Sequence, residues 1–227
     1  MRSVAVALLL ALLVVAAHAQ TKKTPAKRPA PARKAATTMA PLTRVPATIV
    51  CPSELGIGVS TKRRYCDVLS GREPKDGVIV MVPPHRGAAT LSFELHNRHT
   101  YSADLVKSKQ AYRHYTATIG VLTMDNTLVD RAIIDSEFRV ERDLYDRIGG
   151  GAGPGGVKAV APTGSEFVQF ALDEDVTEVS ILGEKLAVVR PDGSDLFTSA
   201  GRPVASISNV MLEYRPAPVR PAPKKKR

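Results

Sequence analysis

Short segments that alternate apolar and polar residues, each followed by turn residues, fill most of this 227-residue chain. In segment 90–97, Leu91, Phe93 and Leu95 alternate with Ser92, Glu94 and His96. A period of two places these two sets on opposite faces of an extended strand. The segment is therefore predicted to be a half-buried β-strand.

Further segments with alternating residues, continuous apolar runs or β-branched residues follow along the chain. We expect strands at 78–82, 111–124, 128–140, 166–172, 176–182, 185–190 and 204–214. In 111–124 the residues Tyr115, Ala117, Ile119 and Val121 share one face. The dipeptide Gly183-Glu184 is predicted to be a two-residue hairpin turn, and Pro191 to Ser194 another turn. The chain has no long segment with a helical period. About nine short strands predict an all-β fold, an antiparallel β-sandwich of immunoglobulin-like or jelly-roll-like type, over residues 49–215.

Charge is distributed unevenly between the ends and the middle of the chain. The formal net charge is +10, from 32 Lys and Arg and 22 Asp and Glu. All the acidic residues lie between Glu54 and Glu213, and the 13 basic residues of 1–48 and 220–227 lie outside this span. The middle is therefore slightly acidic. The Pro/Ala-rich basic segments 20–48 and 216–227 are predicted to be disordered, because they contain too few apolar side chains to form a core.

These basic segments are candidates for electrostatic attachment to an anionic polymer. The residues that would bind it are Lys22, Lys23, Lys27, Arg28, Arg33, Lys34, Lys224, Lys225, Lys226 and Arg227. We expect the partner to be an anionic envelope or extracellular polymer, or a protein, and expect no specific nucleic acid. The alternative is that the segments are spacers whose charge only keeps them extended.

The first 19 residues resemble a cleaved secretory signal peptide. Arg2 precedes an unbroken apolar run over residues 4–17, and Ala17 and Ala19 form a small-x-small cleavage pattern. The run is shorter than the roughly 20 apolar residues that a spanning helix needs. The sequence therefore predicts cleavage after Ala19, a secreted or periplasmic protein and no transmembrane span after cleavage.

The chain has two cysteines, Cys51 and Cys66. An even count in an oxidising compartment predicts one disulfide, located where the folded domain begins. Two cysteines alone supply too few ligands for a structural zinc site.

Other residues suggest a nucleotide-binding, metal-binding or ligand-binding site, but a purely structural role accounts for them better. The glycine-rich segment from Gly149 to Gly156 is interrupted by Pro154 and followed by a predicted strand, so a nucleotide-binding loop is not expected. The histidines His85, His96, His99 and His114 are expected at the surface or in turns. Acidic clusters at 173–175 and 192–195 are expected to be solvated turns. Tyr101, Tyr112 and Tyr115 lie near one strand and are more typical of cross-strand packing than of a ligand platform.

The sequence therefore favours an exported, non-enzymatic binding or structural module. Its basic tails would attach to an anionic polymer, and its sandwich would contact a protein or a glycan. No cofactor, metal site or catalytic residue is predicted. Two alternatives stay open: a secreted hydrolase whose site combines distant strands with the Gly149 to Gly156 loop, and a subunit of a surface assembly with a free edge strand.

Overall fold

The computed structural model describes residues 40–98, 104, 107–108, 114–137, 140–149, 158–160 and 164–218. These residues belong to one compact unit that spans 39–227. Within them, no helix is long and apolar enough to cross a membrane. The predicted signal peptide, most of segment 20–48 and residues 219–227 lie outside the described part.

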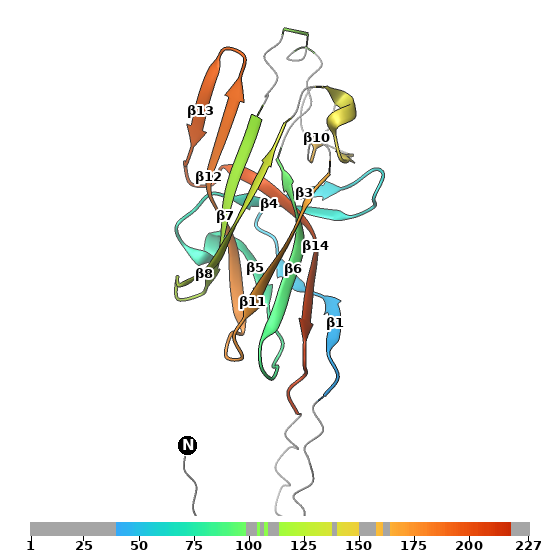
Figure 1. The fold of residues 1–227 in the computed structure, drawn as a ribbon, viewed down its shortest axis with the longest axis vertical. Coiled ribbons are helices and arrows are strands. Elements are labelled where there is room, and N and C mark those ends of the chain that lie inside the picture. The colour runs from blue at the N-terminus through green and yellow to red at the C-terminus, as the bar shows by residue number, and fades with distance from the viewer. Residues whose placement is uncertain are drawn as a thin grey trace, which may run out of the picture. The chain divides into compact units, whose positions relative to one another are not determined.

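The first sheet, sheet A, is antiparallel and contains six strands (Figure 1). Its strand order is β11 (Glu166–Leu172), β6 (Ala89–Asn97), β14 (Pro203–Tyr214), β4 (Arg64–Leu69) and β3 (Glu54–Ile57). The sixth strand, β1 (Thr43–Pro46), pairs with β14 so that Thr43 lies opposite Tyr214.

The second sheet, sheet B, also has six antiparallel strands. Its order is β2 (Thr48–Val50), β5 (Val78–Met81), β12 (Glu178–Arg190), β7 (His114–Thr123) and β8 (Leu128–Ser136), and β13 (Gly193–Phe197) pairs with β12. Leu91, Phe93 and Leu95 of sheet A and Ile119 and Val121 of sheet B are fully buried in one hydrophobic core. The predicted β-sandwich is confirmed.

A small third layer lies on the outer face of sheet A. It contains the 3-10 helix η2 (Glu141–Asp143) and the pair β9 (Arg147–Ile148) and β10 (Lys158–Ala159). Ile148 and Val160 of this layer form a second buried cluster with Leu55 and Tyr65 of sheet A. We call residues 140–149 and 158–160 the covering segment. The described part has one further 3-10 helix, η1 (Pro74–Asp76).

Two details of the predicted strand pattern are wrong. The strands are more numerous than nine, because β3, β4, β13 and the short strands of the covering segment lack a long alternating run. Gly183-Glu184 is not a hairpin turn: β12 continues through it with a register shift against β7. A Cβ at Gly183 would lie 2.3 Å from Val204 Cγ2, so the glycine allows close packing of the two sheets rather than a turn.

The folded part starts earlier than residue 49, because β1 begins at Thr43. Cys51 and Cys66 form the predicted disulfide, with their Cα atoms 5.9 Å apart. Cys66 lies in β4 of sheet A, whereas Cys51 directly follows β2 of sheet B. The disulfide therefore joins the two sheets near the start of the sandwich.

Candidate functional site

A polar layer covers part of the outer face of sheet A. The core side of β6 carries Leu91, Phe93 and Leu95, so Glu94 and His96 point away from the core, as the alternation predicts. The prediction of a half-buried strand is wrong toward the C-terminal end of β6, because the covering segment lies over its outer face. His96 is fully buried as a result.

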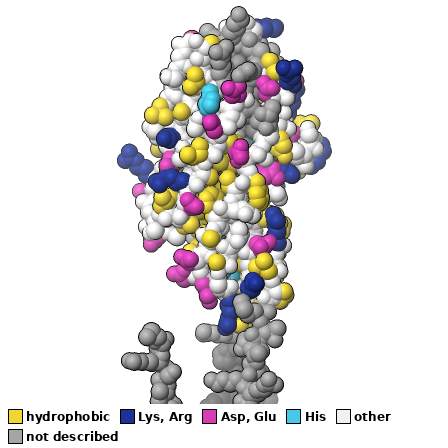
Figure 2. Space-filling view, viewed as in Figure 1, with side chains coloured by type: hydrophobic (Ala, Val, Ile, Leu, Met, Phe, Trp, Pro, Cys, Tyr) yellow, Lys and Arg dark blue, Asp and Glu magenta, His cyan; other side chains and the backbone are white. Residues whose placement is uncertain are grey.

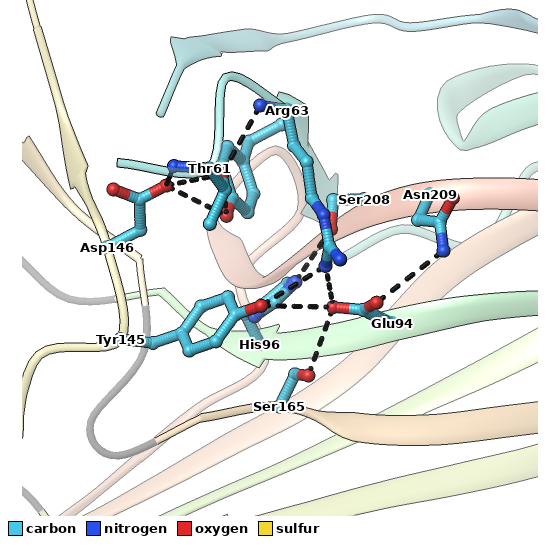
Figure 3. A network of polar contacts seen from close by, with 10 residues as sticks. Thr61, Arg63, Glu94, His96, Tyr145, Asp146, Ser165, Ser208 and Asn209 are labelled. Atoms are coloured by element: carbon cyan, nitrogen blue, oxygen red, sulfur yellow. Dashed lines mark hydrogen bonds and ion pairs between the residues drawn. The ribbon is translucent and has the colours of Figure 1, made fainter. Parts of the chain in front are cut away.

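Glu94 is the centre of the polar layer (Figure 3). Arg63, from the connection between β3 and β4, forms an ion pair with Glu94 Oε2. The same oxygen accepts hydrogen bonds from Ser165 Oγ at 3.2 Å and Tyr145 Oη at 3.4 Å, and Oε1 accepts one from Asn209 Nδ2 at 3.5 Å. Segments far apart in the sequence therefore meet at one carboxylate. We call these five residues the Glu94 cluster.

Asp146 fixes the covering segment to the turn between β3 and β4. Its carboxylate accepts hydrogen bonds from Thr61 Oγ1 at 2.6 Å, Ser60 N at 3.1 Å, Tyr65 Oη at 3.2 Å and Arg147 N at 2.8 Å. Burial alone would raise the pKa of Asp146. The hydrogen bonds from Thr61, Ser60 and Arg147 outweigh it and hold the pKa below its usual value. Asp146 is therefore an ionised structural anchor.

His96 lies between two tyrosine rings. Tyr145 stacks on it at a centroid distance of 5.1 Å, and Tyr65 meets it edge-on at 5.1 Å. Burial lowers the pKa of His96 to about 4, and the nearby Arg63 acts in the same direction, although Glu94, the Gly164 backbone and Asp146 oppose the shift. The expectation that His96 is a surface or turn histidine is wrong.

The pair of His96 and Ser208 has the spacing of a nucleophile and its base, since His96 Nε2 lies 2.9 Å from Ser208 Oγ. Both residues are buried, however. Among the described residues, no carboxylate accepts a hydrogen bond from His96 Nδ1, so none orients the ring there. A pKa of about 4 also makes the imidazole a weak base at neutral pH. This arrangement suits a packed polar layer better than a nucleophilic site.

A β-bulge in β14 directs Asn209 into the Glu94 cluster. The pairing of β14 with β6 shifts register between Ser208 and Met211, and Asn209 has a φ of 53°. This left-handed conformation is uncommon outside glycine, although asparagine tolerates it better than most residues. Asn209 and Arg63 also line a groove of about 360 Å³ beside Ala47 and Cys51. The groove is therefore continuous with the Glu94 cluster.

Phe167 of β11 lies on the other side of Glu94. It is the cross-strand partner of Glu94, so the two side chains are on the same face of sheet A. Its side chain is one of the large exposed apolar groups of the sandwich, with 54% of the residue accessible. An exposed ring, a cluster of planar polar groups and a groove thus follow one another across sheet A.

Only some of the site residues predicted from the sequence lie in the described part of the chain. The disulfide between Cys51 and Cys66 is confirmed. The ten basic residues predicted to bind a polyanion lie outside the described residues, as do His99, Tyr101, Tyr112 and residues 150–156 of the glycine-rich loop. Gly149 is described and exposed.

The remaining aromatic and histidine candidates are separated from one another. Tyr115 is buried in the core, while His114 pairs with Asp135 on sheet B. His85 is buried, contrary to expectation, and its ring nitrogens contact the carbonyl oxygens of Pro83 and Asp173. The described residues contain no group of three or more side chains that could hold a metal ion.

Sequence reasoning misses most of the Glu94 cluster. The alternation places Glu94 on the correct face, but Arg63, Tyr145, Ser165 and Asn209 come from connections and a bulge that have no periodic pattern. The one available signal is Phe167, an aromatic residue beside Glu166 at the start of an alternating strand. Its partner across the sheet cannot be known without the strand register.

Comparison with known proteins gives little further information. No protein-family model and no curated protein matches the chain. The crystal structure of the Agl-KA catalytic domain is similar to 81% of this chain at 11% identity, with a TM-score of 0.33. A catalytic domain of GH87 alpha-1,3-glucanase in complex with nigerose is similar to 82% at 12% identity, with a TM-score of 0.23. The chain covers 29% and 30% of those two chains, and no function is inferred from them.

Proposed function

We propose that this chain is an exported, non-enzymatic binding module. Its basic terminal segments attach it to an anionic envelope or extracellular polymer, and the outer face of sheet A contacts a second ligand. The disulfide between Cys51 and Cys66 supports an oxidising compartment. The burial of Ser208 and His96 favours binding over hydrolysis at this face.

The observation that carries the proposal is the pairing of β1 with β14. Thr43, at the start of β1, lies opposite Tyr214, at the end of β14. The described chain therefore begins and ends at the same end of the sandwich (Figure 1). Both basic segments adjoin this end of the sandwich in sequence, so we expect their charges to act together on one polymer.

The surface near this end carries further basic residues. Arg44 and Arg86 are exposed there, and the backbone N–H of Arg86 donates a hydrogen bond to the carbonyl oxygen of Arg215. Figure 2 shows Lys and Arg side chains close to where the described chain begins and ends. An anionic polymer held by the terminal segments would also contact these side chains.

The Glu94 cluster lies away from this end. Thr90 of β6 pairs with Glu213, next to the last residue of β14. Glu94 is four residues farther along β6, which corresponds to about 14 Å at the usual rise of an antiparallel strand. Attachment through the terminal segments would therefore leave the Glu94 cluster accessible to a second ligand.

We expect neutralisation of the terminal segments to reduce polymer binding strongly. In a chain of residues 20–227, the ten basic residues 22, 23, 27, 28, 33, 34 and 224–227 would be replaced by Gln. Binding to immobilised heparin would be measured across a salt series. The slope of log affinity against log salt should fall by about 0.7–0.9 for each ionic contact that is lost.

A charge-preserving variant is the matched control. Replacing the seven lysines of the set by Arg keeps the charge and should keep both the affinity and the salt slope. Sedimentation with isolated cell envelopes would extend the result to a natural surface. If the Gln variant and the unchanged chain elute at the same salt concentration, the terminal segments are spacers and the attachment proposal is wrong.

A further inference from the structure

We propose that the outer face of sheet A binds an uncharged oligosaccharide, which lies across the strands from Phe167 over the Glu94 cluster toward the groove beside Asn209. This inference rests on the proposed function, because it names the second ligand of the binding module. The observation that supports it is the arrangement across sheet A: an exposed aromatic ring comes first, then planar polar groups, and then a groove.

Phe167 supplies the apolar contact. Sugar rings present C–H groups on one face, and an exposed aromatic ring offers a flat apolar surface on which such a face can pack. Phe167 is 54% exposed although it belongs to a strand of the sandwich. Its position opposite Glu94 places this surface directly beside hydrogen-bonding groups.

The Glu94 cluster supplies directional hydrogen bonds. The guanidinium of Arg63, the carboxylate of Glu94 and the amide of Asn209 are planar groups that can each contact two neighbouring hydroxyls. The contacts from Tyr145 and Asn209 to Glu94, at 3.4 and 3.5 Å, are at the long end of the hydrogen-bond range. Sugar hydroxyls could therefore replace them at little cost.

The charge of the cluster favours an uncharged ligand. Arg63 is already paired with Glu94, so it offers no free positive charge to an acidic sugar. Asp146, in the covering segment, is held ionised by its hydrogen bonds, which lower its pKa. This negative charge would repel a carboxylated or sulfated sugar, whereas it would not repel a neutral sugar.

The dimensions of the face favour several sugar units over one. β11, β6, β14 and β4 are consecutive neighbours, and three strand spacings correspond to about 14 Å. The groove of about 360 Å³, lined by Arg63 and Asn209, continues the same track beyond β14. A chain of sugars running across the strands would contact Phe167 at one end and the groove at the other.

The test is binding of the full chain of residues 20–227 to an array of neutral oligosaccharides built from glucose, mannose, galactose or N-acetylglucosamine. The best binder would then be titrated by calorimetry. Phe167→Ala and Glu94→Gln should each weaken its affinity about tenfold or more, which corresponds to about 1.4 kcal/mol. Phe167→Tyr keeps the ring and should bind like the unchanged chain.

Leu196→Ala is the matched control, because Leu196 is a similarly exposed apolar residue on β13 of sheet B. It should bind like the unchanged chain, as should the variant with ten neutralised terminal residues. Failure of the heparin experiment would thus leave this inference intact. The inference is overturned if no neutral oligosaccharide binds, or if binding persists unchanged in both Phe167→Ala and Glu94→Gln. Since Phe167 is exposed, its replacement by Ala tests binding even if Glu94→Gln fails to fold.

Discussion

Replacement of Asp146 by Ala is expected to lower the free energy of unfolding by about 4 kcal/mol, the largest loss that we expect from a single substitution in the polar layer. Asp146 is buried, and its carboxylate accepts hydrogen bonds from the backbone at Ser60 and Arg147 and from the hydroxyls of Thr61 and Tyr65. Alanine removes the carboxylate, so these backbone N–H groups and hydroxyls lose their hydrogen-bond acceptor.

The magnitude follows from the number of donors that lose their partner. A buried donor without an acceptor costs about 1–3 kcal/mol, and bonds to a charged group are stronger than neutral ones. Water that enters where the carboxylate was would recover part of the loss. Chemical denaturation followed by circular dichroism would measure the change in unfolding free energy.

The loss should also have a defined location. Asp146 links the covering segment to the turn between β3 and β4 by accepting hydrogen bonds from the backbone N–H groups of Ser60, Thr61 and Arg147. Amide hydrogen exchange should therefore accelerate first at these three residues. Core strands such as β7 should keep their protection until global unfolding. Asp130→Ala is the matched control, because Asp130 is exposed on β8. A loss below about 1 kcal/mol for Asp146→Ala would contradict the anchoring role.

The sandwich itself could be predicted from the sequence because a half-buried strand carries its own pattern. The alternation at Leu91, Phe93 and Leu95 is visible in the sequence, and all three residues lie in the core. The turn predicted at Gly183 is wrong for a physical reason. A glycine in a strand indicates either a turn or a close approach of another chain segment, and only packing against Val204 distinguishes them.

The candidate site could not be predicted in the same way. Tyr145 and Asp146 lie in a connection without periodicity, and their partners at Arg63, Thr61 and Glu94 are more than 50 positions away from them in sequence. A long-range contact of this kind depends on the register of several strands. The sequence could still indicate that His96 shares a face with Glu94, but not that another segment covers that face.

Acidification should destabilise the protein through His96. In the unfolded chain this imidazole takes up a proton near its ordinary pKa of 6.5, whereas in the folded protein burial lowers the pKa to about 4. Between these two values the unfolded state binds more protons. The free energy of unfolding is therefore unaffected by His96 above about pH 6.5, falls as the pH drops toward 4, and loses nothing more from this group below that.

The expected loss between pH 7 and pH 4 is about 3 kcal/mol, since each unit of pKa shift corresponds to about 1.4 kcal/mol. The His96 ring faces Glu94, Asp146 and Arg63, and it is packed between Tyr65 and Tyr145. Asp146 adds a separate loss, but only as the pH falls below its unfolded pKa of 3.8, because its folded pKa is lowered. Burial raises the pKa of Asp67, so this group changes the stability in the opposite direction as the pH falls. The contribution of His96 is therefore taken from the comparison with a His96 variant.

Urea denaturation at several pH values would measure this loss in the unchanged chain and in His96→Gln. The variant is expected to be less stable at pH 7, because it changes the packing of the two tyrosines, but its stability should depend much less on pH between 6.5 and 4. Carboxylates present in both proteins contribute equally to the two pH dependences. Their contributions therefore cancel when the unfolding free energies of the two proteins are subtracted. His114→Gln, at a partly exposed histidine on β7, should retain the full acid-dependent loss. Equal pH dependence in the unchanged chain and His96→Gln would mean that the covering segment opens and lets His96 take up its proton while the sandwich stays folded.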